Sequence, residues 1–157
     1  MLPENLKEYA TAAALEAFDS DALQGGKYDR GELTLEVARE KIVAVCRFLK
    51  ENRGFARVST ITGVDRYPDE PRFEVVYHLQ AVEPSERLRL KCRVPSEDLA
   101  IDSVTEVWRG ANWFERETFD LFGVNFRGHP DLRRIMLPDD WEGHPLRKDY
   151  SVMGPRA

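Results

Sequence analysis

Residues 73–94, FEVVYHLQAVEPSERLRLKCRV, carry the clearest structural signal in the chain. Apolar residues fall at every second position from Phe73 to Leu79, and the same spacing returns from Leu88 to Val94. Alternation with period two is typical of β-strands that place one face on a core and the other toward water or a partner. Glu83-Pro84-Ser85 between the two runs favours a turn. The sequence therefore predicts two neighbouring antiparallel strands here.

A third strand and a helix are predicted on the N-terminal side. A weaker strand runs from Phe55 to Val64, and the proline-bearing residues 65–72 turn it into the next one. The preceding residues have helical spacing, with Thr34 as a possible N-cap and Gly54 as a possible C-cap. The apolar face of this helix is Leu35, Ala38, Ile42, Val45 and Leu49. We expect an antiparallel meander with the 35–49 helix on its apolar face.

The C-terminal side begins with a second helical pattern and then loses all periodicity. Helical spacing links Val104, Val107, Ala111, Phe114, Thr118 and Leu121. Residues 123–157 are dense in glycine, proline and charge. The predicted fold class is α+β: a small, mostly antiparallel sheet covered by helices, with an extended, irregular C-terminal tail.

The chain divides by composition into three segments. Residues 1–32 combine an alanine-rich helical stretch with an acidic, glycine-bearing stretch, which predicts a loosely docked N-terminal arm and linker. Residues 33–126 form the predicted α+β core domain, and residues 127–157 form an extended interface tail.

Composition excludes several classes of function. The chain has 157 residues, with 23 Lys plus Arg and 28 Asp plus Glu, and this net charge of −5 argues against a nucleic-acid partner. Two cysteines, Cys46 and Cys92, cannot ligate an iron–sulfur cluster that needs four thiolates. The longest uncharged apolar run, residues 42–46, is far shorter than the ~20 residues of a membrane span. We expect an intracellular chain with free thiols and no membrane anchor.

Cofactor motifs are missing as well. The sequence has no Gly-x-Gly-x-x-Gly, no Cys-x-x-Cys and no Gly-x-Ser-x-Gly, and Gly26-Lys27 lacks the upstream glycine of a phosphate-binding loop. We therefore assign no catalytic residue and no cofactor-binding residue to this chain.

Two groups of residues leave alternatives open. The row Arg87, Arg89, Lys91 and Arg93 is either a solvated outer face or a surface for an acidic protein. His129 and His144 lie in two Gly-His-Pro triplets fifteen residues apart with acids nearby. Two imidazoles and a carboxylate can hold zinc, as in a small metal-dependent hydrolase, but irregular chain rarely fixes such ligands. Capping or interface roles are favoured, and no metal ligand is assigned.

Aromatic residues are concentrated between Trp108 and Phe126. Six occur within nineteen residues, against about two from the overall content of 10%. One reading is a well-packed amphipathic helix with a solvated rim. The other is an obligate interface, in which aromatic residues and arginine are enriched. The irregular, charged tail favours the interface, because such a segment gains order from a partner.

Three blocks of sequence resemble one known family. ERETFDLFG at 115–123, GHPDLRRI at 128–135 and GHPLRKDY at 143–150 are similar to the 30-kDa subunit (the C subunit) of respiratory complex I, NADH–quinone oxidoreductase. The resemblance covers roughly residues 33–150.

The resemblance implies a function for the whole chain. Members lie in the hydrophilic arm of a proton-translocating complex, peripheral to the cytoplasmic face of the bacterial inner membrane. The complex uses FMN, iron–sulfur clusters, NADH and quinone, whereas this polypeptide is expected to be a non-catalytic scaffold without cofactors. Its implied partners are the 49-kDa quinone-site subunit (the D subunit) and the neighbouring B and I subunits, and it reaches the membrane only through the complex. A related membrane-bound hydrogenase or non-NADH quinone reductase stays open, because other subunits bind the electron donor.

The resemblance also marks the predicted partner interface. We expect it to consist of Trp113, Glu115, Arg116, Glu117, Asp120, His129, Arg133, Arg134, His144, Arg147, Lys148 and Asp149.

Overall fold

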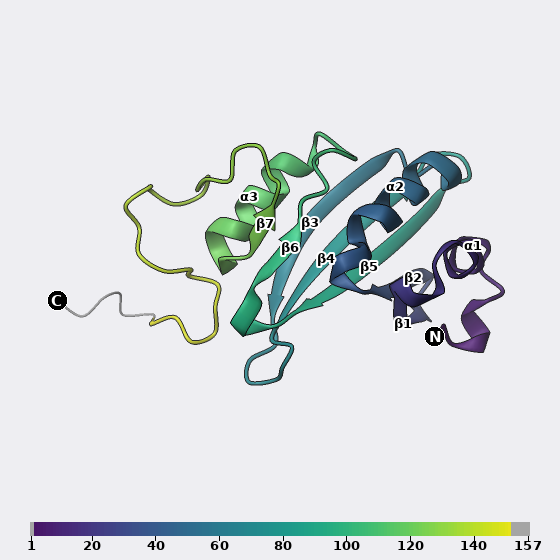
Figure 1. The fold of residues 1–157 in the computed structure, drawn as a ribbon, viewed down its shortest axis with the longest axis horizontal. Coiled ribbons are helices and arrows are strands. Elements are labelled where there is room, and N and C mark those ends of the chain that lie inside the picture. Colours follow the sequence, from purple (N-terminus) through teal and green to yellow (C-terminus); the bar gives the residue numbers. More distant parts are fainter. Residues whose placement is uncertain (1, 152–157) are drawn as a thin grey trace.

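The predicted meander is present in the computed structural model, which describes residues 2–151 (Figure 1). Strands β4 (Phe73–Ala81) and β5 (Glu86–Val94) pair antiparallel along their whole length. β3 (Arg57–Asp65) pairs antiparallel with β4, with a register shift between Val58 and Thr60. The alternation seen in the sequence is the burial pattern of β5, and Val75, Tyr77 and Leu90 are buried on one face. β4 departs from it, because Glu74 and Val76 on its other face are buried as well.

Two further strands extend this sheet. β1 (Leu23–Asp29) pairs antiparallel with β2 (Glu32–Val37), and β2 pairs parallel with β5. The complete order is β1-β2-β5-β4-β3. The prediction that a helix starts at residue 35 is therefore wrong: α2 spans Ile42–Arg53 and follows a short 3-10 turn at Arg39–Lys41. Its predicted end is confirmed, because Gly54 caps it in the left-handed conformation (φ 73°).

The N-terminal residues belong to the core. α1 (Ala10–Phe18) lies between the 3-10 turns Glu4–Leu6 and Ser20–Ala22, and Leu6 and Leu15 are buried. Gly26 in β1 allows the close approach, since a Cβ there would lie 3.0 Å from the Leu6 side chain and 2.7 Å from the Thr34 carbonyl oxygen. The prediction of a loosely docked arm and linker is wrong for residues 2–32, while the division into three segments remains a prediction.

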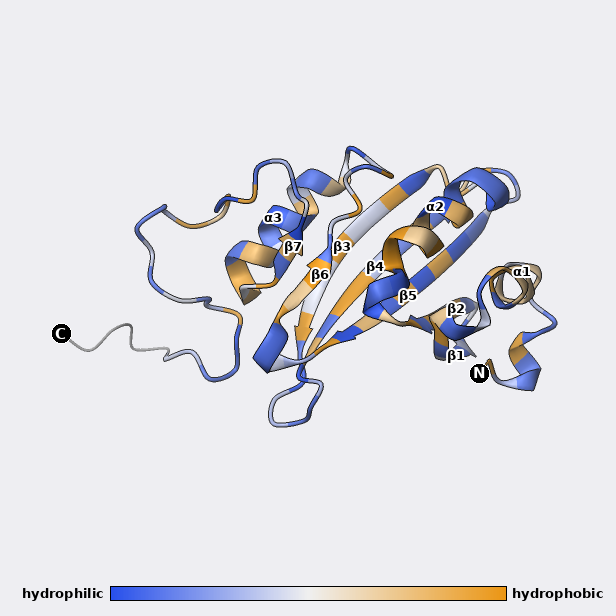
Figure 2. Cartoon of the chain, in the orientation of Figure 1, coloured by the Kyte–Doolittle hydropathy of each residue, from blue (hydrophilic) through white to orange (hydrophobic). Residues whose placement is uncertain are grey.

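Helices cover one face of the sheet. α2 and α3 (Ala111–Phe122) both lie over the face that carries Tyr77 (Figure 1). Figure 2 shows apolar residues along the central strands and on α2 where the helix crosses the sheet. The other face carries the basic row of β5. Its Arg89 pairs with Glu32, while Lys91 and Arg93 share Glu74, so three of the four cations of this row have an acidic partner in the same chain.

α3 starts later than the helical spacing suggested. Residues 104–110 form turns, in which the Val107 and Trp108 N–H groups both donate to the Val104 carbonyl. α3 lies between β6 (Ala100–Asp102) and β7 (Asn125–Arg127) in the chain, and these two strands pair parallel in a separate two-stranded sheet. Residues 128–151, the C-terminal segment, contain no helix or strand. The predicted fold class is confirmed, with an irregular tail at residues 128–151. The tail was expected to be irregular from residue 123, so β7 is a difference, and residues 152–157 of the predicted tail lie outside the described residues. None of the helices formed by residues 2–151 has the length and apolar character needed to cross a bilayer.

Gly63 sets the distance between β3 and α3, which leads to a prediction. A Cβ at this position would lie 2.7 Å from Cδ2 of the Phe122 ring, so Gly63→Ala forces the ring or the helix to move. Overpacking of this kind costs about 1–3 kcal/mol, and each kcal/mol lowers Tm by about 2–4 °C in a chain of this size. Thermal unfolding measures the effect, with Gly110→Ala as control because nothing lies within 4 Å of its added Cβ. Equal Tm values for the two variants would contradict the prediction.

Candidate protein interaction site

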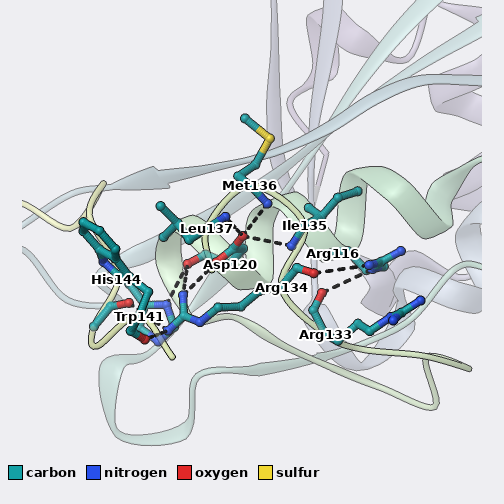
Figure 3. A network of polar contacts seen from close by, with 10 residues as sticks. Arg116, Asp120, Arg133, Arg134, Ile135, Met136, Leu137, Trp141 and His144 are labelled. Carbon is teal, nitrogen blue, oxygen red and sulfur yellow. Dashed lines mark hydrogen bonds and ion pairs between the residues drawn. The ribbon is translucent and has the colours of Figure 1, made fainter. Parts of the chain in front are cut away.

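α3 turns several charged residues toward the interior. Glu115, Arg116 and Asp120 are 0%, 6% and 0% exposed. Arg116 and Asp120 are four residues apart, so they lie on the same side of the helix. The C-terminal segment runs along this side, and its backbone groups meet these charges (Figure 3). Charges this deep in a protein need partners, and the partners identify the role of the site.

Asp120 binds three consecutive backbone N–H groups of the C-terminal segment. Its Oδ2 accepts from Ile135, Met136 and Leu137 at 3.0, 2.7 and 2.9 Å (Figure 3). Its Oδ1 accepts from the Arg134 guanidinium at 2.7 Å. Burial alone raises the pKa of Asp120, but these hydrogen bonds outweigh it and hold the pKa below its usual value. An ionised carboxylate therefore fixes the turn at residues 134–137.

Two arginines satisfy backbone carbonyls that no helix or strand would satisfy. Arg134 donates to the carbonyl oxygens of Trp141 at 2.9 Å and Gly143 at 3.0 Å. Arg116 donates to the carbonyl oxygens of Arg133 and Arg134, both at 3.2 Å. A guanidinium has five donors and no acceptor, so one side chain can hold several carbonyls of an irregular chain.

The end of α3 is capped by the same segment. The His144 Nδ1–H donates to the Asp120 carbonyl at 2.9 Å, and Arg147 Nε donates to the Phe122 carbonyl at 2.6 Å. These are carbonyl groups of the last helical turn, which have no partner within the helix. Burial lowers the pKa of His144, so its ring acts as a neutral donor.

A second anchor lies at the end of β3. Asp65 accepts two hydrogen bonds from the Arg72 guanidinium, at 2.9 and 2.8 Å, and one from the Lys148 backbone N–H at 2.8 Å. Arg72 also pairs with Asp149 at 2.9 Å. The hydrogen bonds from Arg72 hold the pKa of Asp65 well below its usual value. The C-terminal segment is thus attached at both ends.

Glu115 lies at the start of α3 in a different environment. Its carboxyl accepts from the Ser103 hydroxyl at 2.6 Å and the Val104 N–H at 2.7 Å. Burial raises its pKa to about 7 in spite of these two hydrogen bonds. His129 Nε2 is 4.0 Å from its Oε2. That ring is neutral, because Nε2–H donates to the Asn112 carbonyl and Nδ1 accepts from the Asp131 N–H.

The two histidines are held at opposite ends of α3. Their carbonyl partners, Asn112 and Asp120, are eight residues apart, which corresponds to about 12 Å along a helix. A single zinc ion bonds its ligands at about 2 Å, so His129 and His144 do not form one metal site. The arrangement therefore lacks the paired imidazoles on which the hydrolase alternative depends.

Most of the predicted interface residues bind this chain's own backbone rather than facing outward. This group comprises Glu115, Arg116, Asp120, His129, Arg134, His144 and Arg147. Glu117, Arg133, Lys148 and Asp149 are exposed. Trp113 is 61% exposed, and the Arg116 guanidinium lies 5.1 Å from its ring centre. The charges thus hold the C-terminal segment in place, and its outer side is left for other contacts.

Sequence reasoning missed the residues that occupy this outer side. They are Ile135, Met136, Trp141 and Leu146, which are 37%, 61%, 42% and 52% exposed. Met136 points away from Asp120 while its N–H points toward it (Figure 3). The available signal was the presence of large apolar residues in a charge-rich segment without periodicity. We name these four residues and Trp113 the apolar outer surface.

The chain is similar to known proteins over most of its length. Residues 35–156 match the model of the family "Respiratory-chain NADH dehydrogenase, 30 Kd subunit". The C subunit of NADH-quinone oxidoreductase from Geobacter sulfurreducens is 56% identical over 127 residues, which are 80% of this chain and 78% of the relative. The same subunit of Roseiflexus castenholzii is 49% identical over 142 residues, covering 89% of this chain and 82% of the relative.

Solved structures agree with the sequence relatives. A trypsin-resistant fragment of Nqo5 superposes with a TM-score of 0.68 at 34% identity, covering 77% of this chain and 98% of the fragment. A chain of the archaeal membrane-bound sulfane sulfur reductase superposes with a TM-score of 0.80 at 30% identity, covering 94% of this chain and 87% of that one.

Proposed function

This chain belongs to the respiratory-chain NADH dehydrogenase 30 kDa subunit family, and from that premise we propose that it is a structural subunit of the peripheral arm of NADH-quinone oxidoreductase. The complex passes electrons from NADH through FMN and iron–sulfur clusters to quinone. In this proposal the chain performs no chemistry and uses the apolar outer surface to bind a neighbouring subunit.

One observation carries the proposal: buried charges of α3 and Arg134 hold the backbone of the C-terminal segment, while the segment's large apolar side chains are exposed. The side chains of Asp120, Arg116 and Arg134 hydrogen-bond to the segment's own backbone. Met136 and Trp141 are 61% and 42% exposed. Exposed apolar surface of this kind marks interaction sites in soluble chains. A segment already fixed by internal hydrogen bonds also loses less entropy when a partner binds.

The cysteines support a role without a cluster. Cys46 and Cys92 are both 0% exposed, and burial raises the pKa of both thiols. The thiolate is the form that ligates metals, so these positions are poorly suited to hold iron. Within residues 2–151, no group of three or more His, Cys, Asp or Glu side chains is arranged to hold a metal ion.

The proposed partners follow from the family. We place the 49-kDa quinone-site subunit (the D subunit) on the apolar outer surface, with the B and I subunits as further neighbours. The complex lies at the cytoplasmic face of the bacterial inner membrane, and this chain reaches the membrane only through it.

A second candidate is the same structural role in a complex with another electron donor or acceptor. The similarity to a chain of an archaeal sulfane sulfur reductase, over 94% of this chain, favours it, because the fold also serves a complex named for a different substrate. A related hydrogenase or non-NADH quinone reductase falls in the same group. Identifying an NADH-binding subunit among the co-purified chains distinguishes the two candidates.

Charged substitutions in the apolar outer surface test the proposal. Met136→Glu combined with Trp141→Glu is expected to reduce the fraction of tagged chain that co-purifies with the complex about tenfold, since a buried, unpaired carboxylate costs more than the 1.4 kcal/mol that this ratio represents. The Tm of the isolated chain stays within a few degrees, because both side chains already face solvent. Val82→Glu is the control, at an apolar residue 70% exposed in the turn between β4 and β5. Normal assembly of the double variant would refute the proposed surface.

A further inference from the structure

Three basic side chains from separate elements line one groove of about 410 Å³. Lys50 is near the end of α2, Arg57 starts β3, and Arg109 lies in the turn before α3. None of them belongs to the C-terminal segment or to the apolar outer surface. We call this feature the basic groove, and we propose that it binds an acidic peptide segment of a neighbouring subunit.

The charge of the basic groove is uncompensated within the described residues. Its only acidic lining residue, Glu106, is already paired with Arg47. Among residues 2–151, the side chains of Arg57 and Arg109 make no hydrogen bond or ion pair. Lys50 donates only to the backbone carbonyl of Val107. Three positive charges therefore line one groove whose single carboxylate, on Glu106, is already paired with Arg47.

The basic row of β5 differs, because three of its four cations have an acidic partner in the same chain. Arg89 is paired with Glu32, and Lys91 is paired with Glu74. The basic groove lacks this arrangement, which is the pattern of a surface whose counter-charges come from another molecule.

The walls of the groove favour a peptide as its occupant. Val58, Val107 and Trp108 line it with apolar surface and are 7%, 5% and 5% exposed. The Trp108 indole is fixed by a hydrogen bond from Nε1–H to the Phe55 carbonyl at 3.1 Å. Carboxylates for the three cations together with an apolar side chain for this wall are what an acidic peptide supplies.

The charge of the whole chain argues against a polyanionic surface as occupant. With a net charge of −5, the chain is repelled at long range by nucleic acid and by anionic membranes. A short acidic peptide held in place by a complex does not depend on that long-range attraction. The inference rests on the proposed function, because the complex provides the neighbouring subunit.

Carbodiimide coupling in the intact complex tests the inference. Arg57→Lys and Arg109→Lys keep the charge and introduce amines, which carbodiimide joins only to carboxylates in close contact. We expect peptide mapping to find these two positions coupled to Asp or Glu residues of one segment in another subunit. Arg87→Lys is the matched control, because Arg87 is also exposed and unpaired among the described residues but lies outside the groove. The inference is overturned if positions 57 and 109 show no coupling, or if they couple only to carboxylates of this chain.

Charge reversal provides a second readout. Arg57→Glu combined with Arg109→Glu is expected to lower at least twofold the salt concentration at which the chain leaves the complex, whereas Arg87→Glu leaves it unchanged. The Tm of the isolated chain is unaffected, because the replaced side chains have no partner. If the double variant instead loses binding to anionic phosphatidylglycerol vesicles and stays normally in the complex, the occupant is a lipid surface and the inference is overturned. Failure of the unsubstituted chain to co-purify with any subunit would refute the proposed function instead.

Discussion

Asp120→Ala is expected to lower the free energy of unfolding by about 3–5 kcal/mol, the usual cost of removing one member of a buried charged pair. The substitution leaves the Arg134 guanidinium, whose side chain is 14% exposed, without its carboxylate. It also leaves the N–H groups of Ile135, Met136 and Leu137 without their acceptor. Because this turn is irregular, no neighbouring strand or helix can replace the lost hydrogen bonds. We expect the C-terminal segment to detach from α3.

Hydrogen exchange of the isolated chain measures this directly. The amides of residues 135–137 should lose their protection in Asp120→Ala, while the amides of β4 keep theirs up to the new global stability. Glu117→Ala is the control, because Glu117 is an exposed acid three residues earlier on the same helix. Unchanged protection at 135–137 in Asp120→Ala would mean that packing, rather than the carboxylate, holds the segment.

Asp120→Ala is also expected to weaken assembly, but for a different reason than the substitutions in the apolar outer surface. Met136→Glu with Trp141→Glu alters what the partner touches and leaves the segment in place. Asp120→Ala leaves the apolar outer surface chemically intact but removes its fixed shape, so binding must restore the order. The two variants therefore separate surface chemistry from preorganisation as causes of weak binding.

The strands were predictable where one face of the sheet is apolar and the other polar. The period-two pattern in residues 73–94 is visible without knowing which strands pair, and β4 and β5 match it. β2 was missed because Leu35 also fits a helical series with Ala38 and Ile42. What selects the strand is its parallel pairing with β5, about 55 residues later in the chain, and local spacing carries no sign of that partner.

The sequence indicated which residues form the site, but not which partners they bind. The sequence placed Arg116, Asp120 and Arg134 in a partner interface, and in the structure all three bind backbone groups of the same chain. Their partners are backbone N–H and carbonyl groups, which every residue has, so sequence cannot show that the partner is the same chain. The apolar outer surface was hidden for a related reason: an irregular segment has no period that separates inner from outer positions.

Glu115→Gln is expected to remove a pH dependence of stability worth about 3 kcal/mol in the unsubstituted chain. The pKa of Glu115 is raised by burial from 4.5 to about 7. At pH values between these two, the folded state keeps a proton that the unfolded state has lost. At about 1.4 kcal/mol per pKa unit, stability contributed by Glu115 therefore falls as pH rises from about 4.5 to 7 and is constant above that. Gln stays neutral and can still accept from Val104 N–H, while its amide donates to the Ser103 hydroxyl.

Urea unfolding at pH 5, 6, 7 and 8 tests this through the difference in stability between the two chains. The advantage of Glu115 over Gln should shrink with rising pH up to about 7, which separates it from the salt-bridged acids, whose contribution is lost as pH falls. His129 faces the same carboxyl, but burial lowers its pKa, so its ring stays neutral through the upper part of this range. Glu117→Gln, at an exposed position, should show no such trend. A difference between Glu115→Gln and the unsubstituted chain that is flat from pH 5 to 8 would mean that Glu115 is ionised throughout. The carboxylate would then be stabilised by its two hydrogen-bond donors alone, and the start of α3 would be held by an anion, as its end is held by Asp120.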